Sequence, residues 1–184
     1  MRGRTQPRIM LSADYIVGLT DGEGSFTVYP RPPQTGGRGG KSYKIELHYY
    51  LKLQEDDLGV LEKLKEFFGC GAIYLQKDKR ENHTNCYRYE INHYEKIAEV
   101  VIPFFLEHEL QSASKKRDFE LFHEIFKMVQ QQQHFTEEGL TKIMELKHRM
   151  HKNRARWMRE IRSSSGNGKL TLKYSNPSSQ ASWG

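Results

Sequence analysis

The sequence predicts an α+β fold in which helices cover one face of a four-stranded, mixed or antiparallel sheet. Stretches of alternating apolar and polar residues indicate strands, and stretches with apolar residues at helical spacing indicate helices. They follow one another as helix, hairpin, helix, hairpin and further helices. The 184 residues suffice for one domain with a sizeable core. We place it at residues 12–162, between a basic arm (1–11) and a tail (163–184) whose composition predicts disorder.

The first helix is expected at residues 12–21, where Ser12 offers a side-chain oxygen as the N-cap. Its apolar residues fall at helical spacing: Tyr15, Ile16 and Leu19. Gly18 and Gly22 lie four residues apart on one face of this helix. Glycine inside a helix costs roughly 1 kcal/mol against alanine, so this pair indicates that a second helix approaches closely.

Two hairpins are expected to supply the sheet. The first joins residues 25–31 to 43–54 through a cation-bearing tip at 32–41, and the second joins 72–77 to 86–91. Alternation in these strands predicts one core face and one polar face. The polar face is expected to carry Tyr29, Arg31, Lys44, His48, Lys52, Gln54 and Arg88. At this point it is either the solvated side of the sheet or a surface that reads DNA base edges.

Between the hairpins, a helix is expected to begin with Asp56 as its cap and to stop at Gly69. After the second hairpin, residues 93–101 are expected to form a helix that ends at Ile102-Pro103, because proline removes a hydrogen-bond donor.

Apolar residues at helical spacing predict two more helices after residue 114. One opens at residues 115–117, and residues 130–133 are its end and a linker. Thr136 is expected to cap the final helix, whose apolar stripe runs to Met150.

The net charge of +6 is unevenly distributed, because residues 147–173 hold nine basic residues and one acid. A basic segment on a near-neutral body indicates a polyanion partner, either nucleic acid or an anionic membrane surface. No run approaches the roughly 20 apolar residues of a membrane span, and no apolar signal core follows the basic N-terminus, so we expect neither membrane insertion nor secretion. Cys70 and Cys86 lack CxxC spacing and are expected to be buried free thiols.

The end of the first helix carries two acids, Asp21 and Glu23. Acids are disfavoured there because the helix dipole places negative partial charge at the C-terminus. A bound cation would make acids favourable at this position, since a carboxylate and free terminal carbonyls together form a hard-oxygen site. The alternative for Glu23 is an acid in an ordinary turn.

Residues 17–25, Val-Gly-Leu-Thr-Asp-Gly-Glu-Gly-Ser, resemble the signature of the LAGLIDADG homing endonucleases, with glutamate where many members have the catalytic aspartate. The similarity runs on to about Arg154. The resemblance implies the αββαββα fold of that family, with a sheet that saddles double-stranded DNA. It also implies an intron-encoded, site-specific endonuclease that makes a metal-dependent staggered double-strand break in a long near-palindromic target. A single motif implies a homodimer.

The resemblance implies catalytic roles at matching positions. Glu23 and the Gly22 carbonyl would hold Mg²⁺, for which Mn²⁺ or Ca²⁺ could substitute in binding. Gln54 would help to order the nucleophilic water, and one of Lys115 and Lys116 would steady the phosphate or the waters. Asp21 matches an acid with a mainly structural role.

The resemblance also implies two binding surfaces. Val17, Gly18 and Gly22 would form the dimer interface. The DNA-binding residues would be Ser25, Thr27, Tyr29, Arg31, Arg38, Lys41, Lys44, Glu46, His48, Tyr50, Lys52, Tyr74, Gln76, Arg88, Glu90, Arg154 and Arg156.

Two other functions fit the same fold. One is an intron maturase, whose partner would be intron RNA and which would not need Glu23. The other is a non-catalytic DNA-binding regulator, which would be expected to lose the acid that Glu23 retains. For each of the three functions we expect an intracellular location with access to DNA, either an organelle (mitochondrion or chloroplast) or a prokaryotic cytoplasm.

Overall fold

The computed structural model describes residues 10–33, 42–77 and 85–150. Four strands form one sheet in the order β1-β2-β4-β3, and every neighbouring pair is antiparallel. The strands are β1 (Gly24–Arg31), β2 (Lys44–Gln54), β3 (Ala72–Gln76) and β4 (Cys86–Ile91). This confirms the α+β class and selects the antiparallel arrangement.

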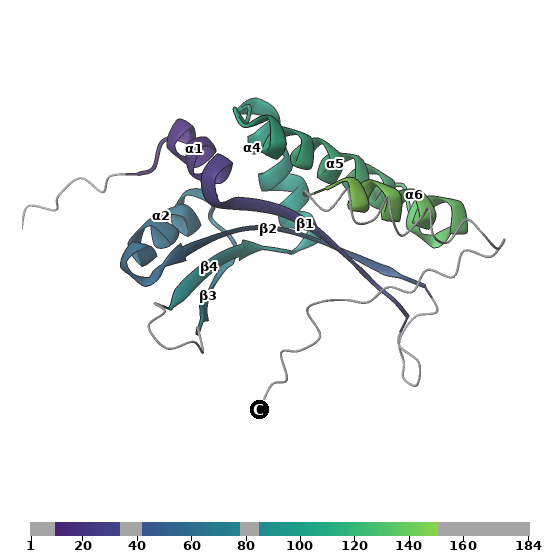
Figure 1. The fold of residues 1–184 in the computed structure, drawn as a ribbon, viewed down its shortest axis with the longest axis horizontal. Coiled ribbons are helices and arrows are strands. Elements are labelled where there is room, and N and C mark those ends of the chain that lie inside the picture. The colour runs from purple at the N-terminus through teal and green to yellow at the C-terminus, as the bar shows by residue number, and fades with distance from the viewer. Residues whose placement is uncertain (1–9, 34–41, 78–84, 151–184) are drawn as a thin grey trace, which may run out of the picture.

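Helices lie on one face of this sheet, and no described element covers the other face (Figure 1). The helical elements are α1 (Ala13–Glu23), η1 (Glu55–Asp57), α2 (Leu58–Phe68), α3 (Tyr94–Lys96), η2 (Ile97–Val101), α4 (Ile102–Glu107), α5 (Ala113–Gln130), η3 (Gln133–Phe135) and α6 (Glu137–Arg149). No helix among the described residues is long and apolar enough to cross a membrane.

Burial alternates along β1 and β2 as the sequence predicts, but it does not alternate along β3. In β1, Phe26 and Val28 are buried while the residues between them are partly exposed, and β2 repeats the pattern from Ile45 to Leu51. The register pairs residues of like polarity, for example Thr27 with His48 and Tyr50 with Glu90. One face of the sheet therefore belongs to the core, and we call the opposite face the outer face.

The centre of the core is a cluster of aromatic rings around Phe26, which is fully buried. Its ring lies 5.2–5.4 Å, centroid to centroid, from those of Tyr49 on β2, Phe105 on α4, and Phe119 and Phe122 on α5. Such ring pairs add roughly 0.5–1.5 kcal/mol each beyond their buried area. They fix α5 against the first hairpin, which matters for the site described below.

Helix ends agree with the sequence in most places. Ser12 caps α1 by accepting a hydrogen bond from the Tyr15 backbone, and Thr136 caps α6 by accepting one from Gly139. Gly69 ends α2 with a positive φ of 63°. Asp56, in contrast, is not a cap: it lies inside the 3₁₀ turn η1, which precedes α2.

The prediction that Ile102-Pro103 ends a helix is wrong. The helical path continues from α3 through the π-helical turn η2 into α4, with Pro103 in the first turn of α4. In the π turn, the Ile102 N–H donates to the Ile97 carbonyl, five residues back. Proline is tolerated in the first turn of a helix, and π turns accommodate such local changes of hydrogen bonding.

The two cysteines are not fully buried, contrary to expectation. Cys70, after α2, is half-buried beside the core, and burial raises the pKa of its thiol. Cys86 is also half-buried but lies on the outer face, because the register pairs it with Gln54 and Gln76.

Several predicted features lie outside the described residues. They are most of the arm 1–11, the hairpin tip with Arg38 and Lys41, and the segment after Met150 with Arg154, Arg156 and the tail 163–184.

Candidate functional site

The junction between α1 and β1 is tightly built. α1 extends two residues beyond the expected end, to Glu23, and β1 begins at the next residue, Gly24. The Gly24 N–H donates to the Thr20 carbonyl, and a Cβ added at Gly24 would lie 2.6 Å from Thr20 Cγ2. The buried Thr20 hydroxyl in turn shares a 2.9 Å hydrogen bond with the Tyr49 hydroxyl. These contacts of Gly24 and Thr20 fix the backbone on which Glu23 lies.

Glu23 itself is exposed, as is Gly22 beside it. Among the described residues, no hydrogen bond or ion pair engages the Glu23 carboxylate, and no basic residue occupies the last turn of α1. A free carboxylate beside helix-terminal carbonyls offers the hard oxygens that Mg²⁺ prefers. These oxygen ligands are of the type that Mg²⁺ binds, but there are few of them. In the described ranges, no group of three His, Cys, Asp or Glu residues could hold a metal.

The structure separates the two lysines of α5. The Lys115 ammonium donates to the Gly24 carbonyl, so this side chain reaches the residue next to Glu23. Lys116 instead forms an exposed ion pair with Glu109. Of the two candidates, Lys115 therefore lies at the junction and Lys116 does not.

Asp21 connects the same junction to the loop before α5. Its Oδ2 accepts a 2.9 Å hydrogen bond from the Gln111 backbone N–H, while Oδ1 is buried without a partner in the described part of the chain. This is a structural contact, as expected for Asp21. Sequence reasoning missed Gln111, because the contact uses its backbone N–H, which carries no residue-type signal.

Gln54 lies at the end of β2 and is exposed. Gly24 pairs with Leu51, so β2 runs three residues past the junction to reach Gln54, about 10 Å along the strand. No contact joins Gln54 to Glu23 among the described residues, but both lie toward the same end of the sheet.

Gly18 and Gly22 lie exposed on α1, and a Cβ added at either would meet nothing within 4 Å. The single chain therefore offers no packing reason for these two glycines. Val17 does not share this surface: it is 7% exposed and packs in the core of its own chain. The assignment of Val17 to a dimer interface is corrected accordingly, because its side chain is enclosed within its own chain.

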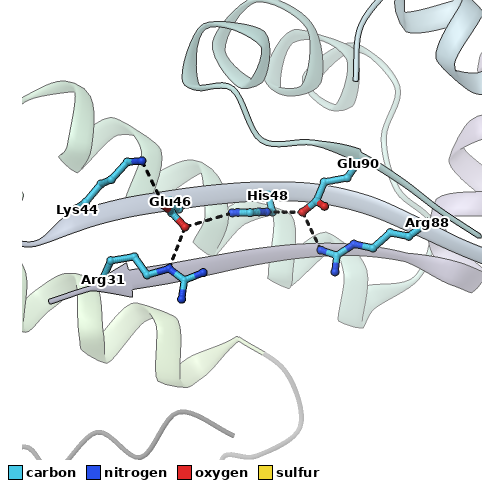
Figure 2. A network of polar contacts seen from close by, with 6 residues as sticks. All are labelled: Arg31, Lys44, Glu46, His48, Arg88 and Glu90. Atoms are coloured by element: carbon cyan, nitrogen blue, oxygen red, sulfur yellow. Dashed lines mark hydrogen bonds and ion pairs between the residues drawn. The ribbon is translucent and has the colours of Figure 1, made fainter. Parts of the chain in front are cut away.

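The outer face carries a network of ion pairs and hydrogen bonds, shown in Figure 2. Glu46 accepts from Arg31 at 3.0 Å and lies 3.2 Å from the Lys44 ammonium. The two ring nitrogens of His48 face two carboxylates, Glu46 at 3.8 Å and Glu90 at closer range. Glu90 also accepts a 2.8 Å hydrogen bond from Arg88 Nη2.

These contacts set the ionisation of the two acids. Partial burial alone would raise the pKa of Glu46, but the Arg31 and Lys44 side chains bring it below its usual value. Burial would likewise raise the pKa of Glu90, and hydrogen bonding and charge from His48 and Arg88 lower it. Both carboxylates are therefore ionised at neutral pH.

The structure brings the described members of the predicted DNA-binding set together on the outer face. Four come from β1, namely Ser25, Thr27, Tyr29 and Arg31, and five from β2, namely Lys44, Glu46, His48, Tyr50 and Lys52. Tyr74 and Gln76 on β3 and Arg88 and Glu90 on β4 complete the set. Burial, and next the nearby Tyr50, raise the pKa of the Tyr29 phenol, while its hydrogen bond with Arg88 acts in the opposite direction.

Comparison with known proteins gives consistent matches. Residues 16–126 match the family model described as LAGLIDADG endonuclease. The chain is 30% identical over 131 residues to probable intron-encoded endonuclease 3 of Neurospora crassa, an alignment that covers 71% of this chain and 23% of the relative. The chain spans about a quarter of the length of the curated relatives that it matches first.

Two solved structures resemble the fold closely. The homing endonuclease I-TnaI is 32% identical with a TM-score of 0.66, over 84% of this chain and 99% of that one. I-SmaMI, bound to an uncleaved DNA target in the presence of calcium ions, is 29% identical with a TM-score of 0.65, over 77% of this chain and 45% of that one.

Proposed function

The chain belongs to the LAGLIDADG endonuclease family, and on that premise we propose that it is a site-specific DNA endonuclease. It would hydrolyse phosphodiester bonds to leave a staggered double-strand break in a long near-palindromic target. The observation that carries the proposal is the α1–β1 junction. There, an exposed Glu23 without a described partner and the Lys115 ammonium from α5 meet beside a polar sheet face.

The reaction would depend on Mg²⁺, which the Glu23 carboxylate and the Gly22 carbonyl would hold. When bound, such an ion stabilises negative charge on phosphate oxygens during hydrolysis. Lys115 would add a positive charge beside the phosphate, and Gln54 would hydrogen-bond the attacking water from the end of β2. Mn²⁺ or Ca²⁺ could replace Mg²⁺ in binding, because both also take oxygen ligands.

The active enzyme would be a homodimer. One junction supplies one carboxylate and one terminal carbonyl, which is too few ligands for ions that stabilise both the attacking and the leaving oxygen. Packing of two α1 helices through Gly18 and Gly22 would bring two junctions to a twofold axis. The near-complete match to I-TnaI and the half-length match to I-SmaMI support a chain that supplies one of two similar units.

Double-stranded DNA would lie against the outer face, whose side chains from four strands can reach base edges in a major groove. Phosphate contacts would make the affinity fall steeply with salt concentration. The relatives are named as intron-encoded endonucleases, which supports an intron-encoded enzyme. Its location would be one with access to DNA, either an organelle or a prokaryotic cytoplasm.

The test is cleavage of a DNA library that spans candidate intron-insertion sites, by the wild-type chain and by Glu23→Gln, with Mg²⁺ or with a chelator. We expect a specific double-strand break only for the wild type with Mg²⁺, while Glu23→Gln still binds the site. Glu62→Gln, which removes an exposed carboxylate on α2, is the matched control and should cut like the wild type.

Two outcomes would contradict the proposal. If the wild type and Glu23→Gln both bind and neither cuts under any metal condition, the chain is a DNA-binding regulator on this fold. If it binds an intron RNA in preference to duplex DNA and promotes splicing with Glu23→Gln as well as with the wild type, it is a maturase.

A further inference from the structure

Among the described residues of the outer face, Arg88 is the most enclosed arginine or lysine. Its guanidinium carbon lies 3.7 Å from the centroid of the Tyr50 ring, and its Nη2 donates to Glu90 at 2.8 Å. The side chain is 20% exposed, compared with 49% for Arg31 and 77% for Lys44. The plane of the guanidinium and its position along the strand are therefore set before any partner binds.

Glu90 is held just as firmly as the arginine that it binds. Its side chain is 10% exposed and also contacts His48, on the neighbouring strand. A carboxylate is unfavourable on a surface that receives a polyanion unless cations surround it. Here the carboxylate lies between the Arg88 guanidinium and the His48 ring, so its effect is to fix Arg88 rather than to face a phosphate.

The terminal nitrogens of Arg88 keep donors that the chain does not use. A guanidinium has five N–H groups. One donates to Glu90, another takes part in a hydrogen bond with the Tyr29 phenol, and Nε is buried without a partner among the described residues. Two N–H groups on the terminal nitrogens remain, which is the number that a planar acceptor with two oxygens or nitrogens would receive.

We propose that Arg88 reads a guanine in the major groove, and that Tyr50 and Glu90 are the residues that position it. The inference rests on the proposed function, because it requires DNA on the outer face. Guanine presents the two adjacent acceptors, O6 and N7, that match an arginine fork, and no other base presents such a pair there. In a twofold-symmetric complex the same G·C pair would be required once in each half-site.

Arg31 provides the matched comparison on the same face. It too is an arginine paired with a glutamate, but it lies at the end of β1, is half exposed and has its guanidinium 5.5 Å from the Tyr29 ring centroid. An exposed and loosely held cation is suited to a phosphate contact, which adds affinity without base preference.

The experiment is a binding selection from a randomised DNA duplex library, with the full chain in Ca²⁺, followed by affinity measurements on single-base-pair variants of the selected site. Arg88→Lys keeps the charge but loses the fork. We expect it to reduce discrimination at one G·C pair per half-site by about 5-fold to 140-fold, leaving other positions and the salt dependence unchanged. Arg31→Lys should leave every base preference unchanged.

Variants of Tyr50 test the positioning role separately. Tyr50→Phe keeps the aromatic ring under the guanidinium and should retain discrimination at the G·C pair that Arg88 reads, whereas Tyr50→Leu should weaken discrimination at that pair, as Arg88→Lys does. Thermal unfolding of each variant shows whether it is folded. Comparison with Tyr50→Phe shows whether the weaker discrimination of Tyr50→Leu comes from loss of the ring or from loss of the hydroxyl.

The results separate this inference from the function on which it rests. If the wild type selects a site and cuts it with Mg²⁺ but Arg88→Lys keeps the same base profile, only the inference is wrong. A uniform loss of affinity with a shallower salt dependence would make Arg88 a phosphate contact and would also overturn it. If the wild type selects no duplex, both proposals are wrong.

Discussion

Replacing Gly18 by alanine should have opposite effects on the single chain and on the dimer. Alanine is favoured over glycine inside a helix by about 0.8–1.0 kcal/mol. Nothing lies within 4 Å of a Cβ added at position 18, so the single chain has no clash to offset this gain. For a chain of this size the gain corresponds to a rise of about 2–4 °C in the unfolding temperature.

In the proposed dimer the same methyl group would lie between two closely packed helices. Overpacking costs about 1–3 kcal/mol per site, and twofold symmetry applies the cost twice. The dimer dissociation constant should therefore rise by about 30-fold to 20,000-fold, and double-strand cleavage should fall at enzyme concentrations near the wild-type dissociation constant.

Sedimentation equilibrium over a range of concentrations measures the dissociation constant, and calorimetry of the dilute chain measures the unfolding temperature. Gly59→Ala is the control, since Gly59 is helical, exposed and equally free of neighbours within 4 Å, but lies on α2. It should stabilise the chain and leave the dimer unchanged. If Gly18→Ala dimerises as well as Gly59→Ala does, the glycine surface of α1 is not the interface.

Three further predictions follow from the junction and the outer face. Gly24→Ala should lower the stability by about 1–3 kcal/mol in urea unfolding, because the methyl would lie 2.6 Å from the Thr20 side chain and 2.8 Å from its backbone; an unchanged midpoint would contradict this packing. Lys115→Met should reduce the cleavage rate about 10²–10³-fold with DNA binding retained, whereas Lys116→Met should cut normally; equal rates for the two variants in single-turnover assays would show that the Lys115 contact has no catalytic role. Burial alone would raise the pKa of Glu90, but His48 and Arg88 lower it below 4.5. The contribution of Glu90 to stability is therefore complete above about pH 4.5 and is lost as the pH falls through the lower pKa of the folded state. Glu90→Gln should therefore flatten the acid limb of a stability–pH curve measured by urea unfolding, and an acid limb identical to that of the wild type would refute this.

Local pattern was enough to predict the two faces of β1 and β2. Alternation along β2 assigned Ile45 and Leu47 to the core and Glu46 and His48 to the outer face, and both assignments are confirmed. Helix caps such as Ser12 were equally readable, because a cap is a contact between residues three apart. At Pro103 local pattern failed, since a π turn lets the helix pass a residue that normally ends one.

The sequence by itself determined the fold class, the two faces of the sheet and the acidic end of the first helix, since these depend on periodicity and on neighbours along the chain. Only the tertiary structure decided that Lys115 and not Lys116 reaches the junction, because its contact with Gly24 joins residues 91 positions apart. It also placed Val17 in the core and Arg88 over Tyr50. Periodicity gives the face of an element on which a side chain lies, but the position of one element along another is set by core packing.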